Sequence, residues 1–127
     1  MNVKIDTKEK FTVLRPKEAL LSANMTVEIE NLLLGYINKE TPHVILNLSD
    51  VTGIEESAAE KIATVQQLFY ENNCSFIVCE MRDAVENVFE KEDLLEIMNV
   101  TPTESEAWDI VQMEEIEREM LGDFEDE

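Results

Sequence analysis

The sequence predicts a single α/β domain in which helices pack against a largely parallel sheet. Between residues 44 and 73, a strand-length run of apolar and β-branched residues is followed by apolar residues at helical spacing. Similar strand-like and helix-like segments alternate along the chain, and such alternation implies right-handed crossovers between parallel strands. A chain of 127 residues with 44% hydrophobic residues is the size of one domain with one core. We expect one domain over residues 1–121 and an acidic, disordered tail over 122–127.

The first predicted elements are two short strands, 3–6 and 11–14, which are separated by polar residues and form a hairpin or two edge strands. Pro16 ends the second strand because proline has no backbone N–H to donate. After a link, Asn24 is the predicted N-cap of an amphipathic helix that extends to about Lys39. The central strand follows.

The middle of the chain predicts a helix and another strand. Apolar residues spaced four, three and four apart give a helix from Ser57, and Asn72 and Asn73 suit its exit. Residues 74–80 have the composition of a second buried strand. Asp83 is the predicted cap of the short helix that comes next.

The last predicted elements are an apolar turn over 94–98, a short strand at Val100 and a final helix capped by Thr103 or Ser105. Gly122 is expected to end this helix. Its inward-facing residues are predicted to be Ala107, Trp108, Val111 and Ile116. Residues expected in the core or at a dimer contact are Trp108, Met113 and Met120.

The formal net charge of -19 argues against nucleic acid or an anionic membrane surface as a partner, because binding to either needs Lys and Arg to displace counterions. The acidic residues keep the chain soluble or, alternatively, mark a face for a basic partner. After Pro102 there are eleven Asp or Glu residues and the single base Arg118. Without an N-terminal signal sequence or an apolar run near the ~20 residues of a membrane helix, we expect a cytoplasmic protein with no membrane insertion.

The sequence contains no complete catalytic or metal-binding pattern. His43 is the only histidine, so one chain cannot complete a histidine-centred metal cluster or a Ser-His-Asp relay. Cys74 and Cys79 are five residues apart in one predicted strand, which places them on opposite faces as reduced, buried thiols. The three glycines are far apart and form no phosphate-binding loop. We therefore expect a protein that is not an enzyme and has no metal or other cofactor.

The segment VILNLSDVTGIEESA, residues 44–58, resembles the signature of the STAS domain family, the anti-sigma factor antagonists of bacteria. The similarity has no gaps over 47–54, and residues 84–98 resemble the family's short helix and the apolar turn after it. The order of elements over 11–121 also fits the family. The resemblance implies a SpoIIAA-like fold, with a mixed sheet of four to five strands and about four helices packed mainly on one face.

In the family, the strand leads to Asp-Ser-Ser-Gly at a helix start, and a kinase that is also the anti-sigma factor phosphorylates the first Ser. The unphosphorylated form binds that kinase and frees a sigma factor. Position by position, the Asp corresponds to Glu55, the phosphorylated Ser to Glu56, the second Ser to Ser57 and the Gly to Ala58. Glu56 cannot be phosphorylated, and its single charge only partly resembles the ~1.5 to 2 charges of phosphoserine.

The residues after this motif also depart from the family. The small and apolar residues that help form the surface offered to the kinase are replaced here by Ala59, Glu60 and Lys61. The resemblance therefore implies a protein partner, while the choice of partner is open.

Ser57 and the two glutamates before it each have a structural and a functional interpretation. Ser57 and Glu60 match the S-x-x-E capping box, whose cap contributes ~1 kcal/mol. Alternatively, phosphorylation has moved to Ser57, where a helix N-terminus favours an anion. Glu55 and Glu56 are favourable at a helix start by ~0.3 to 1 kcal/mol through the aligned peptide dipoles. Alternatively, the charge of Glu56 sets the binding state permanently.

Two functional hypotheses follow. The first is a non-enzymatic interaction module in a partner-switching pathway that regulates transcription, with a partner of the anti-sigma or serine-kinase type. Its predicted contact residues are Glu55, Glu56, Ser57, Ala58 and Lys61. The second keeps the fold but makes the chain a constitutive scaffold, which assembles with itself as a homodimer or with a transporter or stress-signalling complex and has no phosphorylation cycle.

Overall fold

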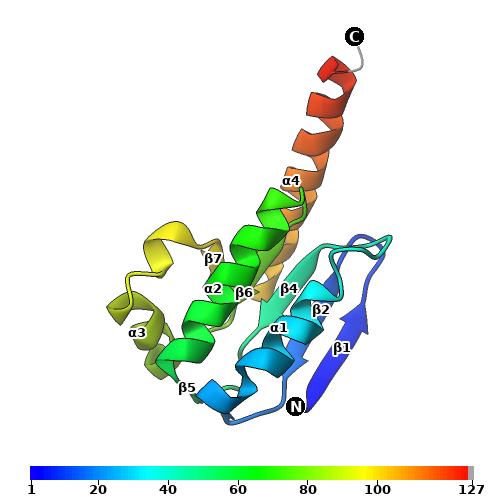
Figure 1. Ribbon diagram of the computed structural model, residues 1–127. Coiled ribbons are helices and arrows are strands. Elements are labelled where there is room, and N and C mark those ends of the chain that lie inside the picture. The colour runs from blue at the N-terminus through cyan, green and yellow to red at the C-terminus, as the bar shows by residue number, and fades with distance from the viewer. Residues whose placement is uncertain (126–127) are drawn as a thin grey trace.

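The main sheet has five strands in the order β1 (Val3–Thr7), β2 (Thr12–Pro16), β4 (Val44–Asn47), β6 (Phe76–Cys79) and β7 (Val100–Thr101). Figure 1 shows the computed structural model, which describes the backbone of residues 1–125 and side chains from the first residue through residue 121. β1 and β2 form the predicted antiparallel hairpin, and the other neighbouring strands are parallel. The sheet is therefore mixed, with its antiparallel strand at one edge.

A second, smaller sheet consists of β3 (Leu20–Leu21) and β5 (Gly53–Ile54), which pair in parallel. The sequence predicted only a link where β3 lies. A two-residue strand is too short to show an alternating pattern, so its pairing depends on β5, which is far away in the sequence.

Four helices cover the sheet. They are α1 (Thr26–Leu34), α2 (Glu56–Glu71), α3 (Asp83–Lys91) and α4 (Glu104–Glu125). The prediction that Asn24 caps α1 is wrong, because a 3-10 turn over Ala23–Met25 precedes the helix. The helix also ends earlier than Lys39, and residues 35–38 form turns. Another 3-10 turn, η2 (Leu95–Ile97), leads to β7.

The predicted exit of α2 is confirmed in detail. Asn73 has a φ of 62°, and it donates its N–H to the Tyr70 carbonyl while Cys74 donates to Phe69. These bonds form a Schellman motif, which satisfies the last carbonyls of a helix. α3 ends in the same way, with Asp93 at a φ of 58°. Its start differs from the prediction, because Asp83 is the first helical residue and not the cap.

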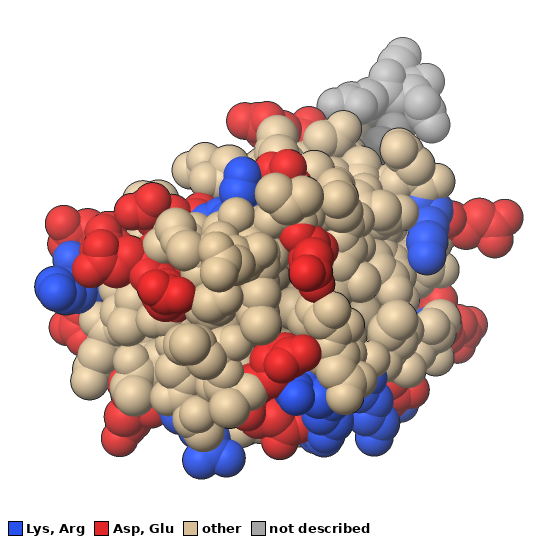
Figure 2. Space-filling model, turned by 60° about the horizontal axis from the view of Figure 1, so that its bottom comes forward, with Lys and Arg blue, Asp and Glu red and all other residues tan. Residues whose placement is uncertain are grey.

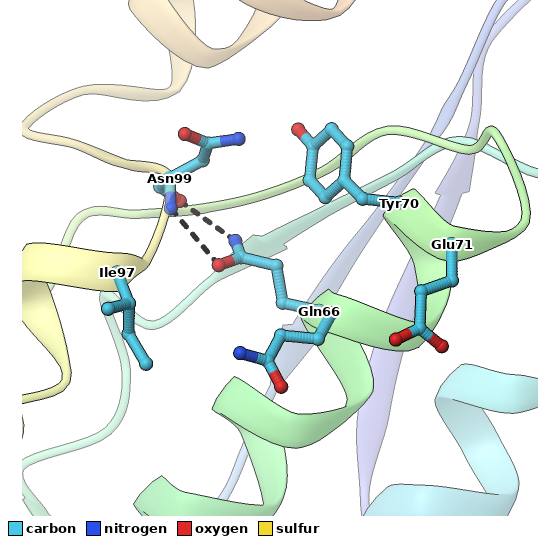
Figure 3. Close-up of a pocket in the computed structure, with 6 residues that line it drawn as sticks. Gln66, Tyr70, Glu71, Ile97 and Asn99 are labelled. Carbon is cyan, nitrogen blue, oxygen red and sulfur yellow. Dashed lines mark hydrogen bonds between the residues drawn. The ribbon is translucent and has the colours of Figure 1, made fainter.

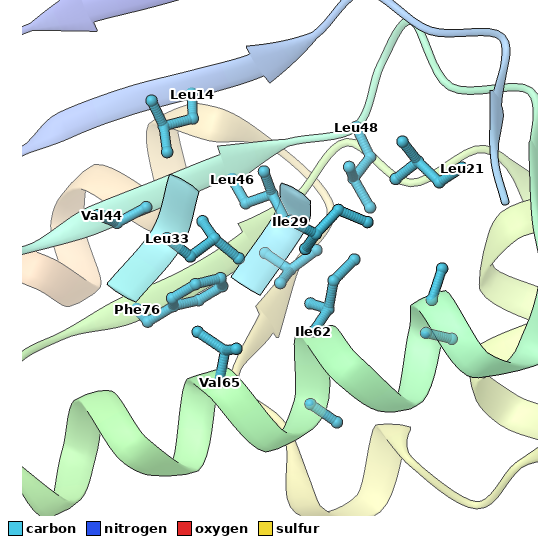
Figure 4. Packing of buried hydrophobic residues seen from close by; sticks show 14 of the residues in the cluster. Leu14, Leu21, Ile29, Leu33, Val44, Leu46, Leu48, Ile62, Val65 and Phe76 are labelled. Carbon is cyan, nitrogen blue, oxygen red and sulfur yellow. The ribbon is translucent and has the colours of Figure 1, made fainter. Parts of the chain in front are cut away.

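Side chains of the parallel strands alternate between two apolar cores, one on each face of the sheet. The larger core contains α1, α2 and α3 residues packed on Val44, Leu46, Phe76 and others (Figure 4). The smaller core contains Phe11, Val13, Ile45, Ile77, Cys79, Ala107 and Val111. Three helices thus cover one face and α4 covers the other. Cys74 belongs to the larger core and Cys79 to the smaller one, and both are free and buried, as predicted.

α4 begins as predicted and then departs from the prediction. The Thr103 hydroxyl accepts the Glu106 N–H at 3.2 Å, which caps the helix. Ala107 and Val111 face inward, but Ile116 is 55% exposed, so its predicted core position is wrong. Met113 and Met120 are also exposed. The helix continues through Gly122 to Glu125, so Gly122 does not end it. Residues 126 and 127 of the predicted tail lie outside the described residues.

Candidate functional site

The start of α2 lies at the carboxyl end of β4, to which residues 48–55 connect it. Val51 and Ile54 anchor this connection in the larger core. Leu48 donates its N–H to the Cys79 carbonyl at 3.0 Å. In open α/β sheets, binding residues collect at the carboxyl ends of the strands. This end is at the bottom of Figure 1, where α1 also begins.

The segment around β3 holds this connection in place. Thr52 and Gly53 donate their N–H groups to the Ala19 carbonyl at 2.8 and 3.0 Å. From the start of α3, the Arg82 Nε donates to the Ser49 carbonyl at 2.8 Å. The helix start is therefore fixed by contacts from two other parts of the chain.

Glu55 is the N-cap residue of α2 and connects it to the segment before α1. Its N–H donates to the Leu21 carbonyl at 2.9 Å, and its carboxylate accepts the Ala23 N–H at 3.0 Å. The predicted capping box is wrong, because Ser57 is the second helical residue and the α2 cap has no side-chain hydrogen bond. Glu55 is the cap residue instead, and both its N–H and its carboxylate are hydrogen-bonded to residues 21–23.

Glu56 and Ser57 occupy the first two helical positions, and both are exposed. The Glu56 carboxylate is 3.9 Å from the Lys91 Nζ, and its side chain is 61% exposed. An ion pair that is this open to solvent contributes little and is screened by salt. Both side chains are therefore accessible to a macromolecule.

Ala58 and Lys61 are placed differently. Ala58 is fully buried, so it supports the helix from beneath and cannot contact a partner. The Lys61 Nζ lies 2.8 Å from the Glu30 carboxylate of α1, in a half-buried pair. Lys61 joins α2 to α1, and its ammonium group already has a partner.

Negative charge is concentrated where α2 starts and α3 ends. Partial burial and the charges of Glu56 and Glu60 raise the pKa of the Glu92 carboxyl. Figure 2, which brings this end of the molecule forward, shows acidic side chains among uncharged surface, with Lys and Arg mostly near the outline. A partner that docks here meets carboxylates.

Leu20 is the residue that sequence reasoning missed. It is 48% exposed, and in the β3–β5 pair it lies opposite Gly53, three residues before α2 begins at Glu56. Only the register of this pair could have indicated it. We define the α2-start surface as the exposed residues Leu20, Glu55, Glu56, Ser57 and Glu60.

A groove of about 560 Å³ lies at the other end of α2, lined by Gln66, Gln67, Tyr70, Glu71, Ile97 and Asn99 (Figure 3). The Gln66 amide donates to the Phe76 carbonyl at 2.7 Å and to the Asn99 carbonyl at 3.0 Å. It also accepts the Asn99 N–H at 3.0 Å. Gln66 therefore ties α2 to the strands, and the groove contains no nucleophile paired with a base.

A network of polar side chains joins α4 to the sheet beyond the smaller core. The Ser75 hydroxyl donates to the Glu114 carboxylate at 2.6 Å and accepts from the Arg118 Nη2 at 2.8 Å. The Ser75 N–H donates to the Nδ1 of His43 at 3.0 Å, so the other ring nitrogen carries the proton. That Nε2 is 2.7 Å from the Glu115 carboxylate. This network fixes the middle of α4.

The network changes the ionisation of its members. Burial lowers the pKa of His43 despite the nearby charge of Glu115, so the imidazole is neutral near pH 7. Burial and the hydrogen bond to Glu114 raise the pKa of Tyr70, whose hydroxyl donates to that carboxylate at 2.9 Å.

Cys79 lies in the smaller core and is not part of this network. Burial raises the pKa of its thiol to about 12, so this thiol is unreactive.

Among the described residues, no group of three or more His, Cys, Asp or Glu side chains could hold a metal ion. No helix in the described part of the chain has both the length and the apolar character that crossing a bilayer requires.

Residues 2–107 match the family model of the STAS domain. The chain belongs to the STAS domain family. A search of curated proteins gives no match. Among solved structures, a proposed anti-sigma factor antagonist from Thermotoga maritima is similar, with a TM-score of 0.78 and 21% identity over 87% of this chain and 94% of that one. The unphosphorylated anti-sigma factor antagonist SpoIIAA has a TM-score of 0.69 and 17% identity over 87% of this STAS chain and 96% of its own.

The murine anion transporter Slc26a9 is also similar, with a TM-score of 0.67 and 14% identity over 82% of this chain. Only 18% of the transporter chain is covered. At these identities the likenesses establish the fold, which is the predicted STAS, SpoIIAA-like arrangement of a five-stranded mixed sheet and four helices.

Proposed function

We propose that this STAS domain is a non-enzymatic, cytoplasmic interaction module that binds a protein of the anti-sigma or serine-kinase type through the α2-start surface. The observation that supports this most directly is the placement of Glu56 and Ser57. Both are exposed on the first turn of α2, and the opposite side of this helix is buried in the core. A rigid element that presents accessible side chains suits recognition of another protein.

We further propose that Glu56 acts as a permanent charge. In the correspondence that we infer from the sequence motif, it occupies the position of the phosphorylated serine, and a carboxylate cannot be removed by a phosphatase. Phosphorylation of Ser57 instead would add ~1.5 to 2 negative charges beside Glu56 and Glu60, and like charges on neighbouring residues repel one another. The acidic surroundings of Ser57 thus favour a fixed state over a cycle.

A constitutive scaffold is the second candidate. The similarity to a small part of the Slc26a9 transporter favours it, because there the matching region belongs to a much longer chain. In this role the same surface would bind a permanent partner, and no kinase would act on Ser57.

The test uses kinase-type anti-sigma proteins encoded in the same genome, purified and titrated by calorimetry against the natural chain and Glu56→Ser. We expect one of them to bind, with different affinities for the two forms. Equal affinities would remove Glu56 from the interface, and absence of binding to all of them would overturn the partner class.

Intact mass after incubation with the bound kinase and ATP separates the two candidates. We expect Glu56→Ser to gain one phosphate and the natural chain to gain none. A phosphate on Ser57 of the natural chain would contradict the permanent charge and restore a switch.

A further inference from the structure

The outward face of α4 carries an apolar stripe whose residues are each more than half exposed, with Lys10 beside Ile116 and Glu119 at one margin. Met113, Ile116 and Met120 are spaced three and four apart, so they lie on one side of the helix. Their exposed fractions are 59%, 55% and 56%, and the adjacent Leu121 is 62% exposed. We call these four residues the outer stripe.

The outer stripe lies opposite the face that attaches α4 to the sheet. At 100° per residue, Val111 and Arg118 project about 160° from the mean direction of the stripe. Val111 is buried in the smaller core and Arg118 binds Ser75. α4 is therefore attached along one side and apolar along the other.

The position of the outer stripe makes it available to another molecule. Figure 1 shows the C-terminal part of α4 extending past the edge of the sheet. The family model ends at residue 107, so the stripe lies beyond the residues that match the STAS family. Single exposed apolar residues are common, but three on one side of a helix with a fourth adjacent to them form a larger exposed apolar patch, and such patches mark interaction sites. Methionine side chains adapt easily to a partner surface.

The charges beside the stripe determine what can occupy it. Exposed Glu117 and Glu119 flank the line of Met113, Ile116 and Met120 on either side, and Leu121 lies beyond Glu117. In the spacing of a helix pair, Met113, Ile116 and Met120 correspond to the apolar seam, and the two glutamates to its charged margins.

A second copy of α4 is disfavoured in this position. In an antiparallel pair each margin would place Glu beside Glu, which is repulsive, and in a parallel pair Glu117 would face Gln112 of the other copy, so neither arrangement offers the glutamates a basic partner. The one basic residue of the described helix, Arg118, is directed inward to Ser75 and Glu115. A helix with Lys or Arg beside its own apolar seam would instead pair with both glutamates.

We propose that the outer stripe of α4 is a docking surface for an amphipathic helix of another protein that carries basic residues beside its apolar seam. This surface is on the opposite face of the sheet from α2 and is independent of the function proposed above. The chain thus has two separate contact surfaces, one at each of two helices.

The test uses two synthetic amphipathic peptides of about 21 residues, three heptads, with leucine in the seam and either Lys or Glu at the margins. Binding to the natural chain is followed by fluorescence anisotropy. We expect the Lys peptide to bind with a salt-dependent affinity and the Glu peptide to bind at least about tenfold more weakly. Equal binding of the two peptides, or no binding of the Lys peptide, would overturn the proposal.

A triple variant, Met113→Gln, Ile116→Gln and Met120→Gln, keeps the net charge and tests whether charge attraction alone explains binding of the Lys peptide. We expect about a tenfold loss of Lys-peptide affinity. The matched control, Val27→Gln with Ile97→Gln, removes exposed apolar residues elsewhere and should bind as the natural chain does. Undiminished binding by the triple variant would overturn the proposal, provided that circular dichroism shows both variants folded.

Two further measurements separate the remaining outcomes. Sedimentation velocity should show a monomer, and a dimer that the triple variant abolishes would make a second copy the occupant instead. Glu56→Lys should leave Lys-peptide binding unchanged. Loss of binding in that variant would place the peptide at the α2-start surface and contradict a site on α4.

Discussion

α2 and α4 pack on opposite faces of the same sheet, but they are held by different forces. α2 buries seven residues along its length, of which only Gln66 is polar. α4 buries Ala107 and Val111 and is then attached through the charged network around Ser75. Apolar burial does not depend on ionisation, whereas the polar network does. The difference indicates that α2 is a fixed platform and that the attachment of α4 depends on pH.

The largest effect is expected in the α2 core. Phe69 is fully buried and makes an edge-to-face contact with Phe76, with ring centroids 5.0 Å apart. Phe69→Ala should lower the free energy of unfolding by about 3–5 kcal/mol, because it leaves a cavity in close-packed surroundings. Urea unfolding measures this loss. A loss below about 1 kcal/mol would show that α2 is not the fixed platform described here.

The polar attachment of α4 should contribute less. Ser75→Ala removes the hydroxyl that joins Glu114 to Arg118, and it should lower the free energy of unfolding by about 1–3 kcal/mol. Hydrogen exchange should rise in the second half of α4 and remain unchanged in α2. The matched control is Ser105→Ala, an exposed serine in the first turn of α4, which should have little effect. Faster exchange in both helices would mean that they are not separately attached.

Acid should weaken the α4 attachment through His43, which faces Glu115, Glu114 and Arg118. The pKa of His43 is lower in the folded protein than its ordinary value of about 6.5. Between the two values the unfolded chain binds more protons, so stability is complete above about pH 6.5 and declines as the pH falls below it. As the pH falls, the natural chain should therefore lose stability relative to His43→Gln, which has no imidazole to protonate. A difference that is constant from pH 7.5 to 5, as measured by urea unfolding, would contradict this role.

The smallest effect is expected at Ser57. Since Glu55 caps α2 and Ser57 is exposed within the first turn, Ser57→Ala should change the free energy of unfolding by less than about 0.5 kcal/mol. A loss near 1 kcal/mol is what a capping serine would give. Thermal unfolding of the two proteins distinguishes these values. The larger loss would restore the capping box that the structure contradicts.

Much of the fold could be predicted from the sequence because the relevant interactions are local. The alternation of strand-like and helix-like segments gave the parallel sheet, Asn72 and Asn73 marked the exit of α2, and Val100 marked the last strand. Thr103 was identified as a cap because the residues that form a cap lie within one turn.

The features that could not be predicted depend on residues that are distant in sequence. β3 forms only because β5 lies beside it, and this pairing brings Leu20 close to the α2 start. The residues after β3 also bind the carboxylate of Glu55, which is the cap residue of α2. The spacing in α4 is compatible with two faces, and only packing against the sheet shows that Val111 is inside and Ile116 outside. The polar network around Ser75 likewise joins residues from four separate segments, at His43, Tyr70, Ser75 and 114–118.

The central claim is that the start of α2 binds a protein partner, and charge reversal at Glu56 tests it most directly. The affinity of the anti-sigma or kinase-type partner is measured for the natural chain, Glu56→Lys and the matched control Glu9→Lys, an exposed acid in the turn between β1 and β2. We predict that Glu56→Lys changes the affinity at least about tenfold and that Glu9→Lys does not. Equal effects of the two substitutions, or no effect of either, would contradict the claim.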